Sequence, residues 1–502
     1  MFTSITELPN ELFYKICYNL SATDILNLRK VCKIFRELID QISFQKKLFH
    51  DIYLPNIKFL PSKPFSLMYY LDQKQNYLKI CNSIENRKKI FNDSSCYKCF
   101  RAFASVCIDS IHIHKKYPKL FFTGDRNRCL SVYNLETVYR QNSKKPMILN
   151  SSSHQGWVWC FSSYEDSLIS GSWDSYLNYW SVDAERIDKI KSYKLDTAVL
   201  SCGYLSNDIA LAGTFQKSIY LIDFRAPNNE VRIANRFHNQ SILCLETVPT
   251  SSEVNLDQIS LDKNSNLLNS LESFQSELTN EEFSSLNDVI ERSVSDISLF
   301  SEDEDVFSDQ FSQDLKDTKI QPLEENAEDV VFSHPMPGLT FFSGSRDKSI
   351  CQWDLRKLNI PVVKHMFRLY PRFVSLVSSE QLWVAEPPGL IHLFDIRNKT
   401  HQKDCLTEAF PQMNLIGTGA LENFKKGFGG LKATQDCLIV NGLNGTVNMF
   451  YPGLPLRPYK KSTILSGLQF PPISVDSNRS TTVVGSTGGD IHIWTDVNSL
   501  LT

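Results

Sequence analysis

The chain has 502 residues and a formal net charge of −3; 42% of its residues are hydrophobic, 22% charged and 12% aromatic. This composition excludes a wholly disordered chain, and 20 glycines and 21 prolines are too few for a collagen-like or low-complexity protein. No stretch approaches the roughly 20 apolar residues of a membrane-crossing helix, and the first residues lack the pattern of a secretory signal. We therefore expect two or three domains in the cytoplasm, the nucleus or both, with the 13 cysteines reduced.

The charge is divided unevenly along the chain. Residues 251–330 contain 21 acidic and 4 basic side chains, a net charge of −17, which leaves +14 on the other 422 residues. This serine-rich segment has no apolar periodicity and is predicted to be disordered. Ser293 and Ser301 precede acidic residues and are candidate phosphorylation sites. Two roles stay open for the segment: an unselected solvated loop, or a salt-sensitive shield that folds back over the basic remainder.

The first fifty residues have the pattern of short helices. Pro9 stands at the predicted start of a helix, where a backbone N–H has no intrahelical acceptor and its absence costs little. Ile16 and Leu20 follow at helical spacing. Ser21 is a candidate N-cap for a second helix, whose apolar residues form a single stripe over about four turns. That stripe consists of Ile25, Leu28, Val31, Cys32, Phe35, Leu38 and Ile39. So small a unit has more apolar surface than it can bury by itself. This indicates a module that docks to a partner.

This stretch, from Leu8-Pro9 to Leu38, resembles the F-box family. The resemblance implies docking to a Skp-type adaptor and, through it, to a cullin-based ubiquitin ligase. The residues that it assigns to adaptor binding are Leu8, Pro9, Glu11, Leu12, Ile16, Leu28 and Val31. The chain departs from the family at Phe35 and Gln45, where tryptophan is common. The alternative interpretation is an ordinary three-helix cap on the following domain.

Residues 51–86 are interpreted as a helical linker. Three prolines, at positions 55, 61 and 64, precede a helical pattern from Ser66 to Cys81. The predicted domains are therefore the helical module at 1–50, the linker at 51–86 and a larger domain at 87–502, with the acidic segment 251–330 inside it.

Residues 87–502 contain a degenerate internal repeat. A small residue is followed by an aromatic or apolar residue nine positions later in six copies, and eight positions later in a seventh. These pairs are Gly124–Tyr133, Gly171–Trp180, Gly213–Ile222, Gly344–Trp353, Ala385–Phe394, Gly442–Phe450 and Gly485–Trp494. Successive copies end 41 to 56 residues apart once residues 251–330 are set aside. Each copy has the pattern strand, turn, strand, and this period is typical of a β-propeller blade.

The copies resemble the WD-repeat family, which implies a mainly β protein with a seven-bladed propeller behind the small all-α module. Two copies have the full set of residues that hydrogen-bond in such blades: His154, Ser170, Asp174 and Trp180 in one, His238, Ser343, Asp347 and Trp353 in the other. The acidic segment falls between the first two strands of the fourth blade. The seventh blade lacks an outer strand after Trp494, so we expect residues 87–92 to supply it and close the ring.

By the same resemblance, the turns at one end of the inner strands line the face that binds partners. The residues at these positions are Arg126, Trp157, Trp159, Trp173, Phe215, Arg346, Arg372, Asn444 and Thr487. Arginine and aromatic residues are enriched in interface hot spots, and arginine suits carboxylates and phosphates, so the expected target is acidic or phosphorylated. The alternative is that the arginines are ordinary exposed charges and that the tryptophans pack inside the sheets.

No catalytic, metal or cofactor site is predicted, and neither nucleic acid nor a membrane is an expected partner. Cys96 and Cys99 lack the second pair of ligands that zinc needs, and His112 and His114 are expected at the surface. No glycine-rich phosphate loop lies between a strand and a helix. The layout therefore implies a non-catalytic receptor subunit of a Skp-cullin-F-box ligase. The alternatives are a scaffold that binds the adaptor without cullin, and a propeller hydrolase, which the missing catalytic cluster disfavours.

Overall fold

The computed structural model describes residues 9–48, 77–248 and 339–500, apart from short gaps within each range. Its helices are α1 (Asn10–Cys17), α2 (Ala22–Leu28), α3 (Lys33–Ile39), α6 (Tyr77–Asn92) and α7 (Leu135–Arg140), and Ser94–Cys96 form a 3-10 turn. None of the helices in these ranges is long and apolar enough to cross a membrane. The acidic segment 251–330, with Ser293 and Ser301, lies outside the described residues.

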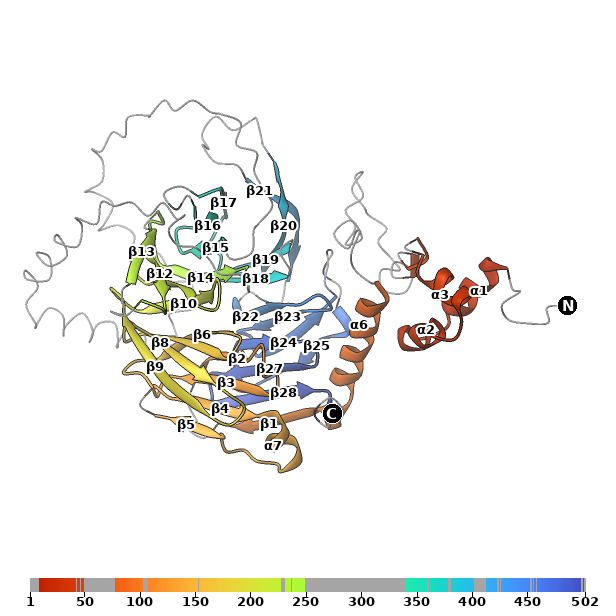
Figure 1. The fold of residues 1–502 in the computed structure, drawn as a ribbon, viewed down its shortest axis with the longest axis horizontal. Helices are drawn as coiled ribbons and strands as arrows, with labels where there is room; N and C mark the ends of the chain where they lie inside the picture. Colours follow the sequence, from red (N-terminus) through yellow and green to blue (C-terminus); the bar gives the residue numbers. More distant parts are fainter. Residues whose placement is uncertain are drawn as a thin grey trace, which may run out of the picture. The chain divides into compact units, whose positions relative to one another are not determined.

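Within the described ranges the strands form seven antiparallel sheets of four strands (Figure 1). The first is β2 (Ile108–Ile113), β3 (Leu120–Asp125), β4 (Leu130–Asn134) and β5 (Ile148–Asn150). The second is β6 (Val158–Tyr164), β7 (Ser167–Ser172), β8 (Tyr176–Val182) and β9 (Ile187–Lys194). The third is β10 (Val199–Tyr204), β11 (Ile209–Thr214), β12 (Ile219–Asp223) and β13 (Val231–Asn235).

The remaining four sheets follow in chain order. The fourth is β14 (Ile242–Thr247), β15 (Thr340–Ser345), β16 (Ser349–Asp354) and β17 (Val363–Met366). The fifth is β18 (Phe373–Val377), β19 (Gln381–Glu386), β20 (Leu390–Thr400) and β21 (Gln412–Ala420). The sixth is β22 (Phe428–Ala433), β23 (Leu438–Gly442), β24 (Thr446–Phe450) and β25 (Pro458–Leu465). The seventh is β26 (Pro472–Ser477), β27 (Thr481–Ser486), β28 (Asp490–Thr495) and β1 (Tyr97–Arg101).

The first strands of the sheets form a closed ring. Strand β2 contacts β6, and the contacts continue through β10, β14, β18, β22 and β26, which contacts β2 again. The other strands of each sheet extend outward by simple antiparallel neighbour pairing. This arrangement is a seven-bladed β-propeller, as the repeat spacing predicts.

The strand that closes the ring differs from the predicted one. Tyr97–Arg101 pair with β28, with Tyr97 opposite Trp494 and Arg101 opposite Asp490. The prediction that residues 87–92 would supply this strand is wrong, because those residues are the last turns of α6. An outer strand from before the first blade still closes the seventh blade, which leaves β28 paired on both sides.

Close packing between blades explains why each repeat has a small residue at this position. It lies at the end of the second strand, where a Cβ on Gly171 would come 2.6 Å from Val199 of the next blade and 2.6 Å from Cys160. Gly213 has the same relation to Ile242, at 2.6 Å. A larger side chain would therefore push neighbouring blades apart.

The turns after these second strands contain residues in the left-handed region of the backbone map. Ser175 has φ 67° and Lys348 has φ 69°, whereas Gly445 and Gly489 occupy the same place in the sixth and seventh blades. These residues form the turns of the strand-turn-strand units that the repeat predicts.

Candidate functional site

The N-terminal helices enclose a small apolar core and expose an apolar face. Phe13, Cys17, Ile25, Phe35 and Ile39 are buried in this core. Exposed large apolar side chains lie on α1 and on the segment from the end of α2 into α3; they are Leu12 at 42%, Ile16 at 39%, Val31 at 69% and Ile34 at 47%. Side chains of this kind without a covering element mark a protein-binding surface.

The predicted adaptor-binding residues divide between this face and the core. Pro9 and Glu11 are exposed beside Leu12 and Ile16, whereas Leu28 is half-buried against the core. Leu8 lies outside the described residues. Ile34 is a further residue of this face that the sequence did not predict; it falls outside the apolar stripe and lies away from the core.

The second helix is shorter than predicted. The apolar stripe from Ile25 to Ile39 is divided between α2 and α3, because the chain leaves the helix at Arg29 and re-enters it at Lys33. The Cys32 sulfur accepts a hydrogen bond from the Phe35 N–H and caps α3. Ser21 caps α2 by accepting the Asp24 N–H at 3.1 Å, as predicted.

Helix α6 contacts both the F-box-like helices and the propeller. Leu78 is part of the N-terminal core, and the Glu85 carboxylate accepts the backbone N–H of Ala22 at 3.1 Å. On the propeller side, Ile84 and Ile90 pack in a cluster with strands of the sixth and seventh blades. Figure 1 shows α6 beside the sheet that contains β28.

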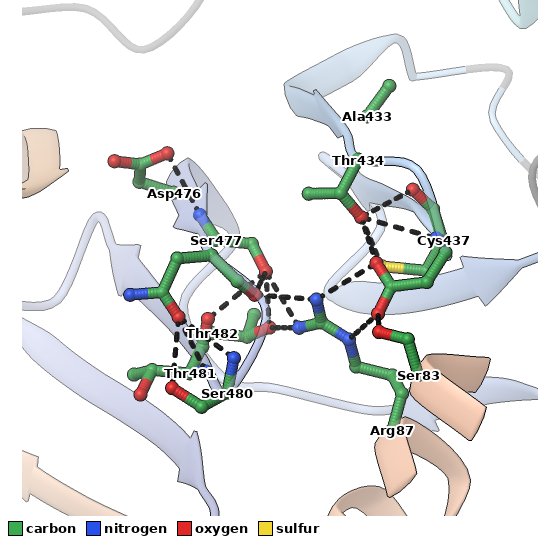
Figure 2. A network of polar contacts seen from close by, with 12 residues as sticks. Ser83, Arg87, Ala433, Thr434, Cys437, Asp476, Ser477, Ser480, Thr481 and Thr482 are labelled. Atoms are coloured by element: carbon green, nitrogen blue, oxygen red, sulfur yellow. Dashed lines mark hydrogen bonds and ion pairs between the residues drawn. The ribbon is translucent and has the colours of Figure 1, made fainter. Parts of the chain in front are cut away.

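A buried arginine holds α6 on the propeller (Figure 2). Arg87 is 1% exposed and its guanidinium donates two hydrogen bonds to the Asp436 carboxylate, at 3.2 and 3.3 Å. It also donates to the Ser477 hydroxyl at 3.0 Å and to the Asn478 carbonyl at 2.5 Å. Burial alone would raise the pKa of Asp436, but the Arg87 charge and its hydrogen bonds outweigh burial and lower it. Arg87 therefore connects α6 to loops of two blades.

Two blades contain the four-residue hydrogen-bonding set typical of WD repeats. In the second blade the His154 ring lies 3.0 Å from Asp174 through Nδ1 and 2.8 Å from the Ser170 hydroxyl through Nε2. The buried Trp180 indole N–H donates to the same hydroxyl at 2.9 Å. Asp174 also accepts backbone N–H groups of Gln155 and Tyr176, so the set fixes the turn to the sheet.

The fourth blade repeats this geometry. His238 lies 2.9 Å from Asp347 and 2.8 Å from the Ser343 hydroxyl, which accepts the Trp353 indole N–H at 2.7 Å. The fifth blade uses other residues: His392 Nε2 lies 2.8 Å from the Glu386 carboxylate. In each of these sets the polar atoms hydrogen-bond one another and hold a turn to its sheet.

Five of the predicted target-binding residues form one connected surface. Trp173 lies at its centre, with ring centroids 5.7 Å from Trp157 and 6.0 Å from Phe215. The Trp159 and Trp173 rings lie edge to face, with their centroids 5.7 Å apart. The Arg126 guanidinium lies over the Trp157 ring, 4.7 Å from its centroid. We call this group, Arg126, Trp157, Trp159, Trp173 and Phe215, the tryptophan cluster.

The tryptophan cluster is partly open to solvent. Phe215 is 43% exposed, and the three tryptophans are half-buried. The cluster spans the first three blades, and Trp173 and Phe215 occupy equivalent turns of the second and third. The Trp173 N–H donates to the Trp157 carbonyl at 3.0 Å, and the Phe215 N–H donates to the Ala198 carbonyl at 2.9 Å. Each acceptor directly precedes the first strand of its blade. Exposed rings supported in this way are typical interface anchors.

The charge of Arg126 is already partnered. Its guanidinium donates to the Asp109 carboxylate at 3.1 to 3.3 Å, and the Asp109 side chain is only 2% exposed. Burial alone would lower the pKa of Arg126, but the Asp109 charge outweighs burial and raises it. Arg126 is therefore held as a fixed part of the cluster and does not offer a vacant fork for an anion.

The other predicted target-binding residues lie at the same end of the blades but outside these ring contacts. Arg346 is exposed, and its backbone N–H donates to Ser241. Arg372 is half-exposed beside Phe373, and burial lowers its pKa to about 10. Thr487 has the equivalent turn position in the seventh blade, but in the sixth that position belongs to Leu443 and not to Asn444, because this copy of the repeat is one residue shorter.

His112 and His114 are buried, so the expectation that they lie at the surface is wrong. His112 Nε2 lies 2.7 Å from the Ser163 hydroxyl, and Nδ1 lies 3.3 Å from Asp476, which also pairs with Lys432 at 2.8 Å. Burial would raise the pKa of Asp476, but the Lys432 charge and the His112 hydrogen bond lower it. This cluster cross-links the inner strands of the first, second, sixth and seventh blades. Its members come from distant repeats, so no local pattern could have revealed it.

Among the described residues, no group of three or more histidine, cysteine, aspartate or glutamate side chains is placed to hold a metal ion. Exposed apolar or aromatic side chains gather at two places in the described part of the chain, the apolar F-box-like face and the tryptophan cluster. The arrangement can therefore bind two partners at two separate surfaces.

Comparison with known proteins agrees with this domain order. The family model of the F-box domain matches residues 5–47. This segment precedes a seven-bladed propeller whose second and fourth blades contain the WD-repeat hydrogen bonds. The chain thus combines an F-box domain with a seven-bladed propeller, which is the domain layout of F-box/WD-repeat proteins.

Two curated relatives carry the same name, F-box/WD repeat-containing protein 9. The human protein is 25% identical over 235 residues, which cover 44% of this chain and 47% of the relative. The Bos taurus protein is 24% identical over 254 residues, which cover 48% of this chain and 51% of the relative. This F-box/WD-repeat chain thus matches about half the length of these relatives.

Among solved structures, the β-propeller domain of Cps50 (Swd1) from Myceliophteria thermophila has a TM-score of 0.48 and 11% identity to this F-box/WD-repeat protein. The match covers 80% of this chain and 98% of that domain. A similarity this low adds nothing to the fold that the strands themselves define.

Proposed function

We propose that this F-box/WD-repeat protein is a substrate receptor of a Skp-cullin-F-box ubiquitin ligase. Its F-box would bind a Skp-type adaptor, its propeller would bind a protein target, and the target would be ubiquitinated for degradation by the proteasome. The protein itself would catalyse nothing. It would act in the cytoplasm, the nucleus or both.

The observation that carries this proposal is the uncovered apolar face of the F-box. Leu12, Ile16, Val31 and Ile34 are exposed, whereas the core of the same domain is closed by Leu78 of α6. Apolar side chains in this number on so small a domain are costly in water unless a partner covers them. The match to the F-box domain model supports a Skp-type adaptor as that partner.

The proposed mechanism is proximity. Because α6 contacts both the F-box and the propeller, a target on the propeller is tied to whatever the F-box binds. Tethering replaces free encounter by a high effective concentration, in the millimolar range for short connections. The tryptophan cluster supplies the target surface, and the paired state of Arg126 favours an apolar anchor there.

The test compares affinity purifications of the full chain and of a Val31→Asp, Ile34→Asp variant. Both residues are exposed, so the substitutions place charge on the interface and not in the core. We expect mass spectrometry to find adaptor and cullin with the wild type and to lose both with the variant. Ile190→Asp is the matched control, since Ile190 is 52% exposed on the outer strand β9, and it should retain both.

Other outcomes would change the conclusion. Adaptor without cullin from the wild-type chain would favour a scaffold that recruits no ligase. Adaptor binding that survives the double substitution would show that the exposed face is not the docking surface.

A further inference from the structure

Exposed cations lie on both sides of the tryptophan cluster. Lys217 is two residues after Phe215 in a turn of the third blade, and Arg128 is two residues after Arg126 in the equivalent turn of the first blade. Lys348 holds the same turn position in the fourth blade. All three side chains are exposed, and no carboxylate of the described residues forms an ion pair with any of them. These charges are therefore available to a partner.

Carboxylates in the same turns and loops are engaged by other groups. Asp109 pairs with Arg126 at 3.1 Å, and Asp174 lies 3.0 Å from the histidine ring of its blade's hydrogen-bonding set. Asp196, which is exposed, accepts the Ser218 hydroxyl at 3.0 Å. The charge that this surface presents to a partner is thus positive at both sides of the cluster, and charge complementarity favours an acidic partner.

The rings between these cations offer an apolar anchor site. The Trp157, Trp173 and Phe215 rings follow one another with centroids 5.7 and 6.0 Å apart, and neighbouring ring planes are tilted by 59° and 45°. Phe215 is 43% exposed, so this end of the row is open. An aromatic side chain of a partner can extend the row through the tilted or edge-to-face contacts that aromatic pairs prefer.

The order of rings and charges sets the spacing of the matching ligand. Arg128 and Lys217 belong to the first and third blades, and the tryptophans between them belong to the second. An extended chain advances about 3.3 Å per residue, so residues two or three positions from an anchored side chain lie about 7–10 Å from it on either side. Long cationic side chains in the flanking turns meet such residues, whereas the residue next to the anchor stays over the rings.

We propose that the propeller recognises an extended segment of its protein targets in which one aromatic residue is flanked, two or three positions away on each side, by aspartate or glutamate. The aromatic residue packs on Trp173 and Phe215, and the acidic residues pair with Arg128 and Lys217. The segment needs no phosphate, because the aromatic anchor supplies most of the binding energy. This inference rests on the proposed function for the existence of a target and specifies the chemistry of that target.

The test selects peptides with the immobilised full chain from a phage-displayed library of random sequences. Peptides of about 12 residues are long enough, since they extend to about 40 Å. Deep sequencing should show an aromatic residue with aspartate or glutamate two or three positions away, enriched about tenfold or more over the starting library. A fluorescein-labelled copy of the most enriched peptide then gives the affinity by anisotropy, and raising the salt concentration should weaken it.

Surface variants locate the contact. The Arg128→Glu, Lys217→Glu variant should select lysine and arginine in place of the acidic residues and keep the aromatic anchor. Phe215→Ala should weaken binding of the labelled peptide by about tenfold. Ile190→Asp, on the outer strand β9, is the matched control and should select the wild-type pattern. Circular dichroism melting curves establish that each variant is folded.

Three results would overturn the inference. They are enriched peptides without an aromatic residue, acidic flanks that persist after the charge reversal, and a wild-type chain that enriches nothing beyond the Phe215→Ala chain. The selection needs neither adaptor nor cullin, so it fails separately from the proposed function. Adaptor and cullin in the purification beside a failed selection would overturn this inference alone, whereas their absence beside a successful selection would overturn the ligase role and leave the peptide site standing.

Discussion

At the scale of single residues, buried ion pairs hold together parts that are far apart in the sequence. Arg87 and Asp436 are separated by 349 positions and are 1% and 3% exposed through their side chains. Their mutual hydrogen bonds, with those from Ser83 at 2.6 Å and Thr434 at 2.5 Å, compensate the loss of hydration. Removing one member would leave the other charged and buried.

We therefore expect Arg87→Met to lower the free energy of unfolding by about 3–5 kcal/mol. Adding Asp436→Asn to this variant should recover part of the loss, since the unpaired charge is then gone. The control is Arg186→Met, whose partner Asp188 is exposed and whose removal should change stability by less than about 1 kcal/mol. Urea unfolding followed by tryptophan fluorescence measures all three, and equal losses for Arg87→Met and Arg186→Met would contradict the argument.

At the scale of strands and blades, the repeat is conserved in shape more than in residue type. The glycine at the end of the second strand recurs because the first strand of the next blade passes within van der Waals distance of it. The aromatic residue at the end of the third strand fills the sheet interior, as Trp180 and Trp353 do at 0% exposure. Blade packing thus explains why the small residue and the aromatic or apolar residue recur in all seven copies, whereas the hydrogen-bonding sets occur in only some of them.

Gly171→Ala should destabilise the protein by about 1–3 kcal/mol, because the new Cβ would overlap Cys160 and Val199. Gly417→Ala is the comparison within a strand, where the new Cβ meets only a Leu454 methyl group at 3.1 Å. We expect a smaller loss there, since that methyl group can move. Thermal unfolding of the two variants tests this, and a larger loss for Gly417→Ala would refute the packing argument.

At the scale of the whole molecule, buried titratable groups in several blades should make stability depend on pH. Burial would raise the pKa values of Asp174, Asp347 and Asp476, but hydrogen bonds and charges from His154, His238 and Lys432 respectively lower them. Since an unfolded aspartate has a pKa near 3.9, these carboxylates stabilise the fold above that value. Their contribution disappears as the pH falls further, through the folded pKa values.

His114 adds a window at higher pH. Burial lowers its pKa to about 4, and its Nδ1 accepts the Tyr117 N–H, which requires the neutral ring. The unfolded chain, with a histidine pKa near 6.5, binds this proton first, so stability should fall as the pH drops from about 6.5 to 4.

Urea unfolding at pH 7, 5.5, 4.5 and 3.5 separates the two windows. We expect His114→Phe to flatten the decline between pH 7 and 4.5, and Asp347→Asn to flatten the decline below about pH 4. Asp347→Asn should also lower stability at pH 7 by about 1.5–3 kcal/mol through weaker hydrogen bonds. A wild-type profile that is flat from pH 7 to 3.5 would contradict both assignments.

The sequence by itself determined the features that depend on neighbours in the chain or on a regular period. The Ser21 cap, the strand-turn-strand units and the seven blades follow from local hydrogen bonding and from a recurring spacing. The tertiary structure alone decided which strand closes the ring, that His112, His114 and Arg87 are buried, and that Arg126 is neutralised by Asp109. These features depend on contacts between repeats or across the whole chain, and a degenerate repeat gives no local signal for such partners, because their pairing is set by how the blades pack.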